Sequence, residues 1–405
     1  MERQASWKNR TVFGFTLASL LSDASHEMAT AVLPLYLQHL GLGASVLGMI
    51  EGLSDVFGSG AKWVAGAAGQ KIQRKKPITA LSYAVVTGCV GAFSFVTTAL
   101  PFILLRVIAW TARGFRGPLR DNLIADSVEP AQYGKAYGLE RAGDMAGAVL
   151  GPLLAAGFLA LGMKLDRIFL LTLFPGLGAV LAVLWIVREK TTKDETIKQR
   201  LLRPPLPAPY WAFLAAVLLF GMGDFSRTFL IFEAGRRLSG AHTGIYLTVP
   251  VLLYVLHNAV SGLSAFPAGA LTDRWSHAKT LLLGYGMGFA FTIGLAFLPG
   301  GLLPLLPLFV LSGVYIAIEE TVEKAAAAKM IPEGARSYAL GMLATANSVG
   351  DLVSSVLTGW LLDQRGPVWA YGVAAGFTGA GFLALFCFTI KYGKSVKHEM
   401  TELGG

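Results

Sequence analysis

Four arginines, Arg106, Arg113, Arg116 and Arg120, recur within one largely apolar stretch of the chain. Their spacings of seven, three and four residues place them on one stripe of a helix with 3.6 residues per turn. A charge near the centre of a bilayer costs at least about 2.5–3.5 kcal/mol on insertion scales. We therefore expect this face to border a polar internal cavity. In the alternative interpretation the helix is short, and Arg116 and Arg120 lie at its cytoplasmic end.

Other apolar stretches also carry ionisable side chains, several of them on one helical face, such as Asp23, His26 and Glu27. A carboxyl group that carries a transported proton must titrate as its surroundings change, and burial and a nearby arginine act on its pKa in opposite directions. The candidates for proton coupling are Asp23, Glu27, Glu51, Asp55 and Asp224. The candidates for the wall of a substrate cavity are Asp23, His26, Glu27, Arg106, Trp110, Arg113, Arg227, Tyr315 and Glu319.

The composition indicates that these residues lie in membrane helices. The 405 residues are 54% hydrophobic and 15% charged, with a mean hydropathy of +0.56. Apolar stretches of about 20 residues, the length that crosses a bilayer as a helix, recur along the chain. We read twelve spans, near 11–37, 44–66, 78–100, 102–124, 135–162, 167–187, 209–233, 244–270, 279–298, 302–325, 338–362 and 367–390.

The charge pattern predicts the orientation of the spans. Lysines and arginines cluster in alternate loops, and this pattern predicts that both termini lie in the cytoplasm. The same loops account for the net charge of +9, so the charge does not indicate a nucleic-acid partner. No cleavable signal peptide is expected. Cys89 and Cys387 both lie inside apolar spans, so we expect neither a disulfide framework nor a metal site. The sequence has no phosphate-binding loop, so we do not expect transport driven by ATP hydrolysis. It has no nucleophile–base arrangement either, so we expect neither an enzyme activity nor a cofactor.

The two halves of the chain resemble each other. A proline-ending polar linker at 188–209 separates an expected N-terminal bundle, 1–187, from a C-terminal bundle with a short tail, 210–405. At an offset of 203 residues, Ala136-Tyr-Gly138 matches Ala339-Leu-Gly341, and Gly147 matches Gly350. Several matches at one offset predict a duplicated six-helix unit.

These features resemble the major facilitator superfamily (MFS) over nearly the whole chain. The family pattern Gly-x-x-x-Asp-Arg-x-Gly-Arg-Lys follows its second span. Gly269 to Lys279 keeps the Asp273-Arg274 pair, whereas Gly66 to Lys76 has Gln70 in place of the acid. The resemblance implies a charge network that gates the cytoplasmic side, for which the candidates are Arg74, Arg116, Arg120, Asp126, Asp273, Arg274, Glu319 and Glu323.

A second motif is similar to one in the drug/proton antiporter branch of the family. It is Gly147-x-x-x-Gly151-Pro152 in the fifth span, although glycines four apart also serve ordinary helix packing. Arg106 resembles the family's arginine of the fourth span, with Trp110 standing where a glycine is usual. The resemblance further implies an all-α membrane fold of two pseudo-symmetric six-helix bundles, with spans 1, 4, 7 and 10 around a central cavity.

We therefore expect a secondary active transporter that moves a small organic solute by alternating access, as a proton-coupled exporter. The alternatives are a proton-coupled importer of an organic anion or zwitterion and, from another class, a non-transporting membrane receptor. The expected partners are a small-molecule substrate, protons or sodium, and the lipid bilayer. The protein is expected to be a monomer with many membrane passes, in the inner membrane if it is bacterial.

Overall fold

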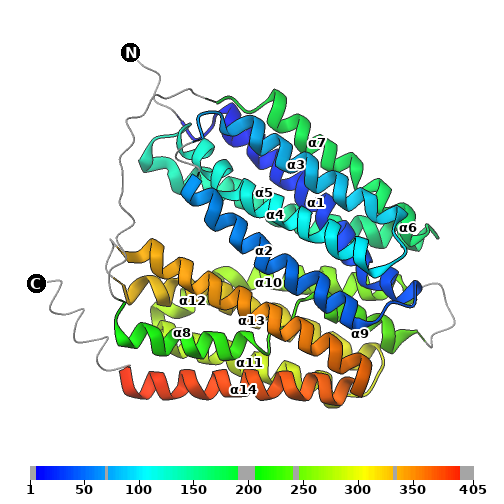
Figure 1. The fold of residues 1–405 in the computed structure, drawn as a ribbon. Coiled ribbons are helices and arrows are strands. Elements are labelled where there is room, and N and C mark those ends of the chain that lie inside the picture. Colours follow the sequence, from blue (N-terminus) through cyan, green and yellow to red (C-terminus); the bar gives the residue numbers. More distant parts are fainter. Residues whose placement is uncertain (1–5, 69–71, 190–205, 240–245, 332–334, 393–405) are drawn as a thin grey trace, which may run out of the picture. The chain divides into compact units, whose positions relative to one another are not determined.

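The computed structural model describes residues 6–68, 72–189, 206–239, 246–331 and 335–392 (Figure 1). These residues form helices and connecting turns, with no strand among them. The helices of the N-terminal half are α1 Arg10–His39, α2 Ala44–Ala68, α3 Lys75–Ala92, η1 Phe93–Phe95, α4 Ala99–Ala125, η2 Pro130–Gln132, α5 Tyr133–Ala160, α6 Leu165–Leu171 and α7 Leu173–Trp185. Those of the C-terminal half are α8 Ala208–Gly221, α9 Thr228–Leu238, α10 Thr248–Arg274, α11 His277–Phe297, α12 Leu302–Lys329, α13 Arg336–Arg365 and α14 Pro367–Tyr392.

Many of these helices present apolar side chains outward. Phe266 is 85% exposed, Leu161 83% and Leu303 80%, exposures that a bilayer accommodates and water does not. In the part of the chain that the structure describes, eight helices are long and apolar enough to span a membrane. The protein is therefore an all-helical, multi-pass membrane protein. The count of twelve spans and the cytoplasmic position of both termini stay predictions.

Two of the predicted spans are interrupted. The span expected at 167–187 is divided at Thr172, because Pro175 has no N–H to donate to the carbonyl group of Leu171. The span expected at 209–233 is divided more deeply, since residues 222–227 between α8 and α9 are not helical. The hydropathy pattern did not indicate this second break, which falls on Asp224 and Arg227.

The chain folds into two compact units. The first unit lies within Met1–Leu42, Leu53–Ile197 and Leu230–Val255, and the second within Gly43–Gly52, Lys198–Phe229 and Leu256–Gly405. The expected bundle boundaries at 187 and 210 stay a prediction, because most of the linker, residues 190–205, lies outside the described residues.

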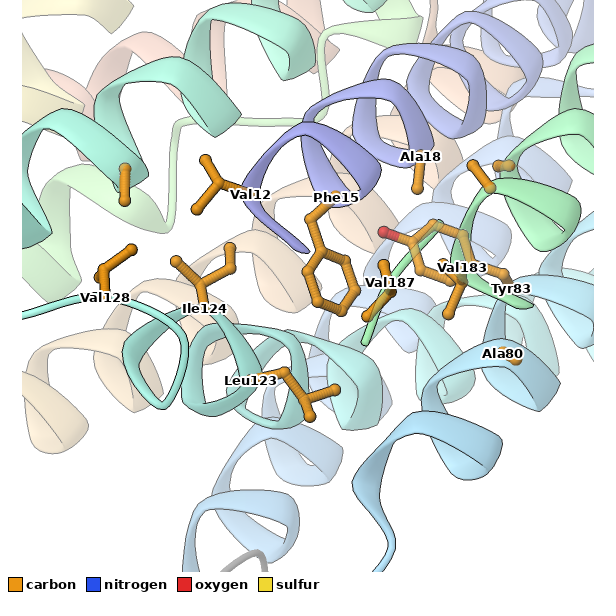
Figure 2. Close-up of a cluster of buried hydrophobic side chains, with 13 residues drawn as sticks. Val12, Phe15, Ala18, Ala80, Tyr83, Leu123, Ile124, Val128, Val183 and Val187 are labelled. Atoms are coloured by element: carbon orange, nitrogen blue, oxygen red, sulfur yellow. The ribbon is translucent and has the colours of Figure 1, made fainter. Parts of the chain in front are cut away.

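The first unit is built on α1, which packs against α5 and α7, while α3 packs against α4 and α7. Buried side chains from these five helices and the adjoining turns meet in the cluster of Figure 2. Its members are Val12, Phe15, Ala18, Ala80, Tyr83, Leu123, Ile124, Val128, Ala136, Ala179, Ala182, Val183 and Val187. This core holds together α1, which carries Asp23 and Glu27, and α4, which carries the four arginines.

In the second unit, α11 packs against α12 and α14, and α8 packs against α13 and α14. The ring of Phe220 stacks on that of Tyr285, with centroids 3.8 Å apart and planes 11° apart. This stacked pair connects the end of α8 to α11 just before the interruption that carries Asp224.

A glycine stripe on α5 brings that helix against the backbone of α1. A Cβ atom on Gly143 would lie 2.6 Å from the carbonyl oxygen of Thr16, and one on Gly151 would lie 2.5 Å from that of Ala24. A Cβ atom on Gly147, between them, would overlap the carbonyl oxygen of Leu20. Close helix packing therefore accounts for Gly147 and Gly151 in the antiporter-like motif, whose third member, Pro152, is buried inside α5. A role of this motif in transport stays a prediction.

We expect Gly147→Ala to destabilise the protein by about 1–3 kcal/mol, the usual cost of overpacking, because the obstructing atom is backbone and cannot rotate away. Gly157→Ala is the matched control on the same helix, since no atom lies within 4 Å of a Cβ atom there. Alanine also favours helix over glycine, so the control is expected to be neutral or slightly stabilising. Thermal unfolding of both variants in detergent measures the difference. Equal melting temperatures would contradict the proposed packing.

Candidate functional site

Asp23 and Arg113 form an ion pair within the first unit. The Nη2 atom of Arg113, on α4, lies 3.1 Å from Oδ1 and 3.3 Å from Oδ2 of Asp23, on α1. The Asp23 side chain is 5% exposed, whereas that of Arg113 is 28% exposed. The carboxyl group of Asp144, on α5, lies close enough to interact electrostatically with that of Asp23. Three helices thus meet at one buried carboxyl group.

A second cluster surrounds Trp110, one turn from Arg113 on α4. The guanidinium carbon of Arg106 lies 3.6 Å from the centroid of the Trp110 ring, within the range of a cation–π contact. The ring of His26 meets the same indole edge-on, with centroids 4.5 Å apart. Thr30 joins both residues, because its Oγ1 atom accepts from Arg106 Nη2 at 3.2 Å and lies 3.1 Å from His26 Nδ1. Arg106 is 1% exposed, so the charge that the sequence placed deep in the membrane lies inside protein.

Glu27 borders this cluster without being part of it. Its Oε1 atom lies 3.6 Å from His26 Nε2, and its Oε2 atom accepts from the hydroxyl group of Tyr254 at 3.0 Å. Tyr254, on α10, belongs to the same unit. The three residues of the first predicted face therefore have different surroundings. Asp23 pairs with Arg113, His26 lies against Trp110, and Glu27 lies beside His26 and Tyr254.

The two remaining arginines of the α4 stripe have partners within the same unit. Arg116 donates to Ser22 Oγ at 3.1 Å and lies over the ring of Tyr83, with 3.8 Å between its guanidinium carbon and the centroid. Arg120 forms a buried ion pair with Glu140. Ser19 accepts from Arg120 at 3.1 Å and donates to Glu140 at 2.5 Å. These contacts fix α4 to α1 and α5, and a gating role for either arginine stays a prediction.

In the second unit, Asp224 lies in the nonhelical segment between α8 and α9. The hydroxyl group of Tyr315 donates to its Oδ1 atom at 2.8 Å, and the Glu319 carboxyl group is close enough to interact electrostatically with that of Asp224. The hydroxyl group of Ser354, on α13, donates to the backbone carbonyl of Asp224 at 2.9 Å. Interrupted helices are where membrane transporters commonly bind solutes and ions, because the unwound backbone offers polar groups inside the membrane.

Glu323, one turn beyond Glu319 on α12, is buried and has its own partners. It accepts from the Tyr285 hydroxyl group at 2.5 Å and from Asn347 Nδ2 at 3.1 Å. Arg227 forms an ion pair with Glu320, the neighbour of Glu319 that faces outward. All these contacts lie inside the second unit, so they neither test nor require a gate between the two units.

The other predicted site residues are spread along the fold. Glu51 accepts from Ser226 Oγ at 3.3 Å in the second unit, whereas Asp55, one turn later, lines a cavity of the first unit. On the expected cytoplasmic side, Lys75 Nζ lies 3.1 Å from Asp126 Oδ2. Arg74 is exposed before α3 and Arg274 at the end of α10, and the side chain of Asp273 lies outside what the structure describes.

Two acidic residues of α5 were not among the predicted site residues. Asp144 contacts Asp23, and Glu140 neutralises Arg120. Their spacing of four residues, interleaved with Gly143 and Gly147, indicated that both point toward the helix that the glycines contact. No group of three potential metal-ligating side chains is found among the described residues.

Sequence comparison finds relatives that are transporters. The Major Facilitator Superfamily profile matches residues 15–255 and 236–403. The chain is 26% identical over 361 residues to an uncharacterized MFS-type transporter of Methanocaldococcus jannaschii, covering 87% of this chain and 88% of the relative. It is also 26% identical over 289 residues to the multidrug resistance protein MdtG of Escherichia coli, covering 68% and 69% of the two chains.

Solved structures share the fold at low identity. The nucleoside transporter NupG superposes with a TM-score of 0.75 at 14% identity, covering 94% of this chain and 99% of its own. The peptide transporter POT in complex with sulfate superposes with a TM-score of 0.73 at 12% identity, covering 96% and 95%. At such identities the likeness concerns the architecture and not the solute.

Proposed function

Because the chain belongs to the Major Facilitator Superfamily and is a membrane transporter, we propose that it exports a small organic solute in exchange for protons. The observation that carries this proposal is the buried carboxyl group of Asp23, which Arg113 and Asp144 both contact. In the proposed cycle, twelve spans alternate between inward and outward access with both termini in the cytoplasm, and a single chain suffices.

The geometry around Asp23 suits a group that gains and loses a proton. Two neighbouring carboxyl groups repel each other when both are ionised, so the pair favours a state in which one of them is protonated. The Asp23–Asp144 contact therefore provides a place for one proton. Arg113 at 3.1 Å favours the ionised form of the same group. A change in either contact during the transport cycle moves the balance between the two forms.

The second unit repeats this chemistry with different helices. Asp224 and Glu319 form another pair of neighbouring carboxyl groups, with Tyr315 donating to Asp224. The pair includes the interrupted segment between α8 and α9, where a small backbone rearrangement would separate the two groups. It supports Asp224 as the alternative proton carrier.

Export is the proposed direction because of the likeness to a protein named for multidrug resistance, an outcome that export of the drugs would produce. Import of an organic anion or zwitterion with protons is the second candidate. The observation that favours it is the pair of cations Arg106 and Arg113 beside Trp110, which suits a negatively charged group.

Everted membrane vesicles distinguish the two directions. Respiration acidifies the lumen of these vesicles, and a fluorescent amine measures the luminal pH. A panel of cationic, zwitterionic and anionic aromatic compounds is then added. If the protein exchanges the solute for protons, a transported compound accumulates inside the vesicles and dissipates the pH gradient. Both effects are expected to be larger than in vesicles without the protein. Accumulation that persists after an ionophore collapses the gradient would overturn proton coupling. Acid-driven uptake by intact cells, with none by everted vesicles, would establish import.

A further inference from the structure

A small cavity lies between α2 and α4 of the first unit, beside the Asp23–Arg113 ion pair. Its volume is about 90 Å³, and its wall consists of Asp55, Gly58, Ser59, Lys62, Trp110, Arg113 and Gly114. Drug-sized ligands occupy pockets of about 300–1,000 Å³. This cavity therefore has room for a head group only, and the remainder of a larger compound would extend outside it.

The position of the cavity follows from a close contact between the two helices. A Cβ atom on Gly114 would overlap the carbonyl oxygen of Gly58, so the backbones of α2 and α4 touch there. Ser59 and Lys62 follow Asp55 by four and seven residues. These spacings place all three side chains, together with Gly58, on the face of α2 that meets α4. The glycine contact thus sets a stripe of polar side chains against Trp110 and Arg113.

Arg113 connects the cavity to the ion pair. Its Nη2 atom contacts Asp23, whereas its Nη1 atom is buried without a hydrogen-bond partner among the described residues. Buried donors of a charged group are nearly always satisfied, so this N–H group can donate to whatever occupies the cavity. A carboxylate is the acceptor that a guanidinium prefers.

The charges around the cavity define the class of ligand. The charged side chains of the wall itself are Lys62 and Arg113, which are cationic, and Asp55, which is anionic. A ligand that carries both signs finds an oppositely charged partner in this wall for each of its charges. The indole of Trp110 adds an apolar surface at the same wall.

We propose that this cavity binds the head group of a zwitterionic solute, an amine and a carboxylate on one carbon or on neighbouring carbons. The carboxylate binds Arg113 and Lys62, the ammonium group binds Asp55, and the apolar remainder lies against Trp110. This inference rests on the proposed transport function, since it names the class of the transported solute. It assigns a substrate contact to Lys62, and it makes Asp55 a ligand of the solute.

Three compounds with one phenyl ring test the inference by calorimetry on the purified full-length protein. Phenylalanine carries both charges, phenethylamine only the positive one, and 3-phenylpropionate only the negative one. We expect phenylalanine to bind with a dissociation constant below about 1 mM and at least about tenfold more tightly than either of the others. Comparable binding of all three compounds, or no binding of phenylalanine, would overturn the proposal.

Variants localise the binding to the cavity. Lys62→Gln and Asp55→Asn are each expected to weaken phenylalanine binding about tenfold, as the loss of one charge-assisted hydrogen bond does. Lys135→Gln and Asp121→Asn remove the same charges away from the cavity and are expected to leave binding unchanged. Arg113 is not substituted here, because its loss also removes the partner of Asp23. Unaltered binding in both cavity variants would place the ligand elsewhere.

The two proposals fail in different ways. If phenylalanine does not bind but purely cationic compounds still exchange with protons in vesicles, only the assignment of the cavity is wrong. If phenylalanine binds with the expected selectivity but no compound moves protons, the cavity assignment stands and the proposed proton coupling is wrong.

Discussion

Asp23→Asn is expected to reduce proton exchange in everted vesicles to the level of vesicles without the protein. Asparagine has nearly the shape of aspartate and still accepts a hydrogen bond from Arg113, but it cannot carry a proton. The variant is expected to fold, because the Arg113 side chain is 28% exposed and water can solvate the charge that loses its partner. Size-exclusion chromatography and the vesicle assay measure folding and exchange on the same preparation.

Asp121→Asn is the matched control, since Asp121 lies on α4 with its side chain 48% exposed and pairs with Arg120 at 3.2 Å. Its exchange is expected to equal that of the wild type. Asp144→Asn preserves Asp23 but removes its carboxyl partner, and we expect partial loss of exchange. Full exchange by Asp23→Asn, together with none by Asp224→Asn, would move the proton site to the second unit.

Glu140→Leu is expected to destabilise the protein by about 3–5 kcal/mol, because it leaves the charge of Arg120 buried without its partner. The Glu140 side chain is 6% exposed and that of Arg120 is 18% exposed, so water replaces little of the lost attraction. The double variant Arg120→Met/Glu140→Leu removes both charges and is expected to recover most of the loss. Equilibrium unfolding in mixed micelles measures all three proteins.

The control for this experiment is an ion pair of the same helix whose cation is exposed. Arg141 pairs with Asp144 at 2.6 Å, and the two side chains are 61% and 13% exposed. Water solvates the exposed guanidinium group and weakens the pair, so Arg141→Met is expected to destabilise the protein less than Glu140→Leu. A loss in Glu140→Leu no larger than that in Arg141→Met would show that the Arg120–Glu140 pair does not hold α4 and α5 together. A double variant as unstable as Glu140→Leu would show that the loss lies in packing.

The sequence determined those features that depend on neighbouring residues along one helix. The span expected at 11–37 is α1, Arg10–His39, and the one expected at 338–362 is α13, Arg336–Arg365. The stripe of arginines was also predictable, because residues spaced by seven, three and four positions lie on one face of an α-helix. The family followed from the same local patterns together with the repeat, and the sequence profile confirms it.

Only the tertiary structure decided which side chains meet. The partner of Arg120 is Glu140 and that of Arg113 is Asp23, although both arginines lie on one stripe and both acids lie on helices that α4 contacts. The choice depends on the rotation and axial shift of α1, α4 and α5 relative to one another. Glycine contacts such as Gly147 against Leu20 set those shifts, and their effect cannot be read from either helix alone. The interruption at Asp224 has the same origin, because Ser354 of another helix satisfies the carbonyl group that a continuous helix would have bonded internally.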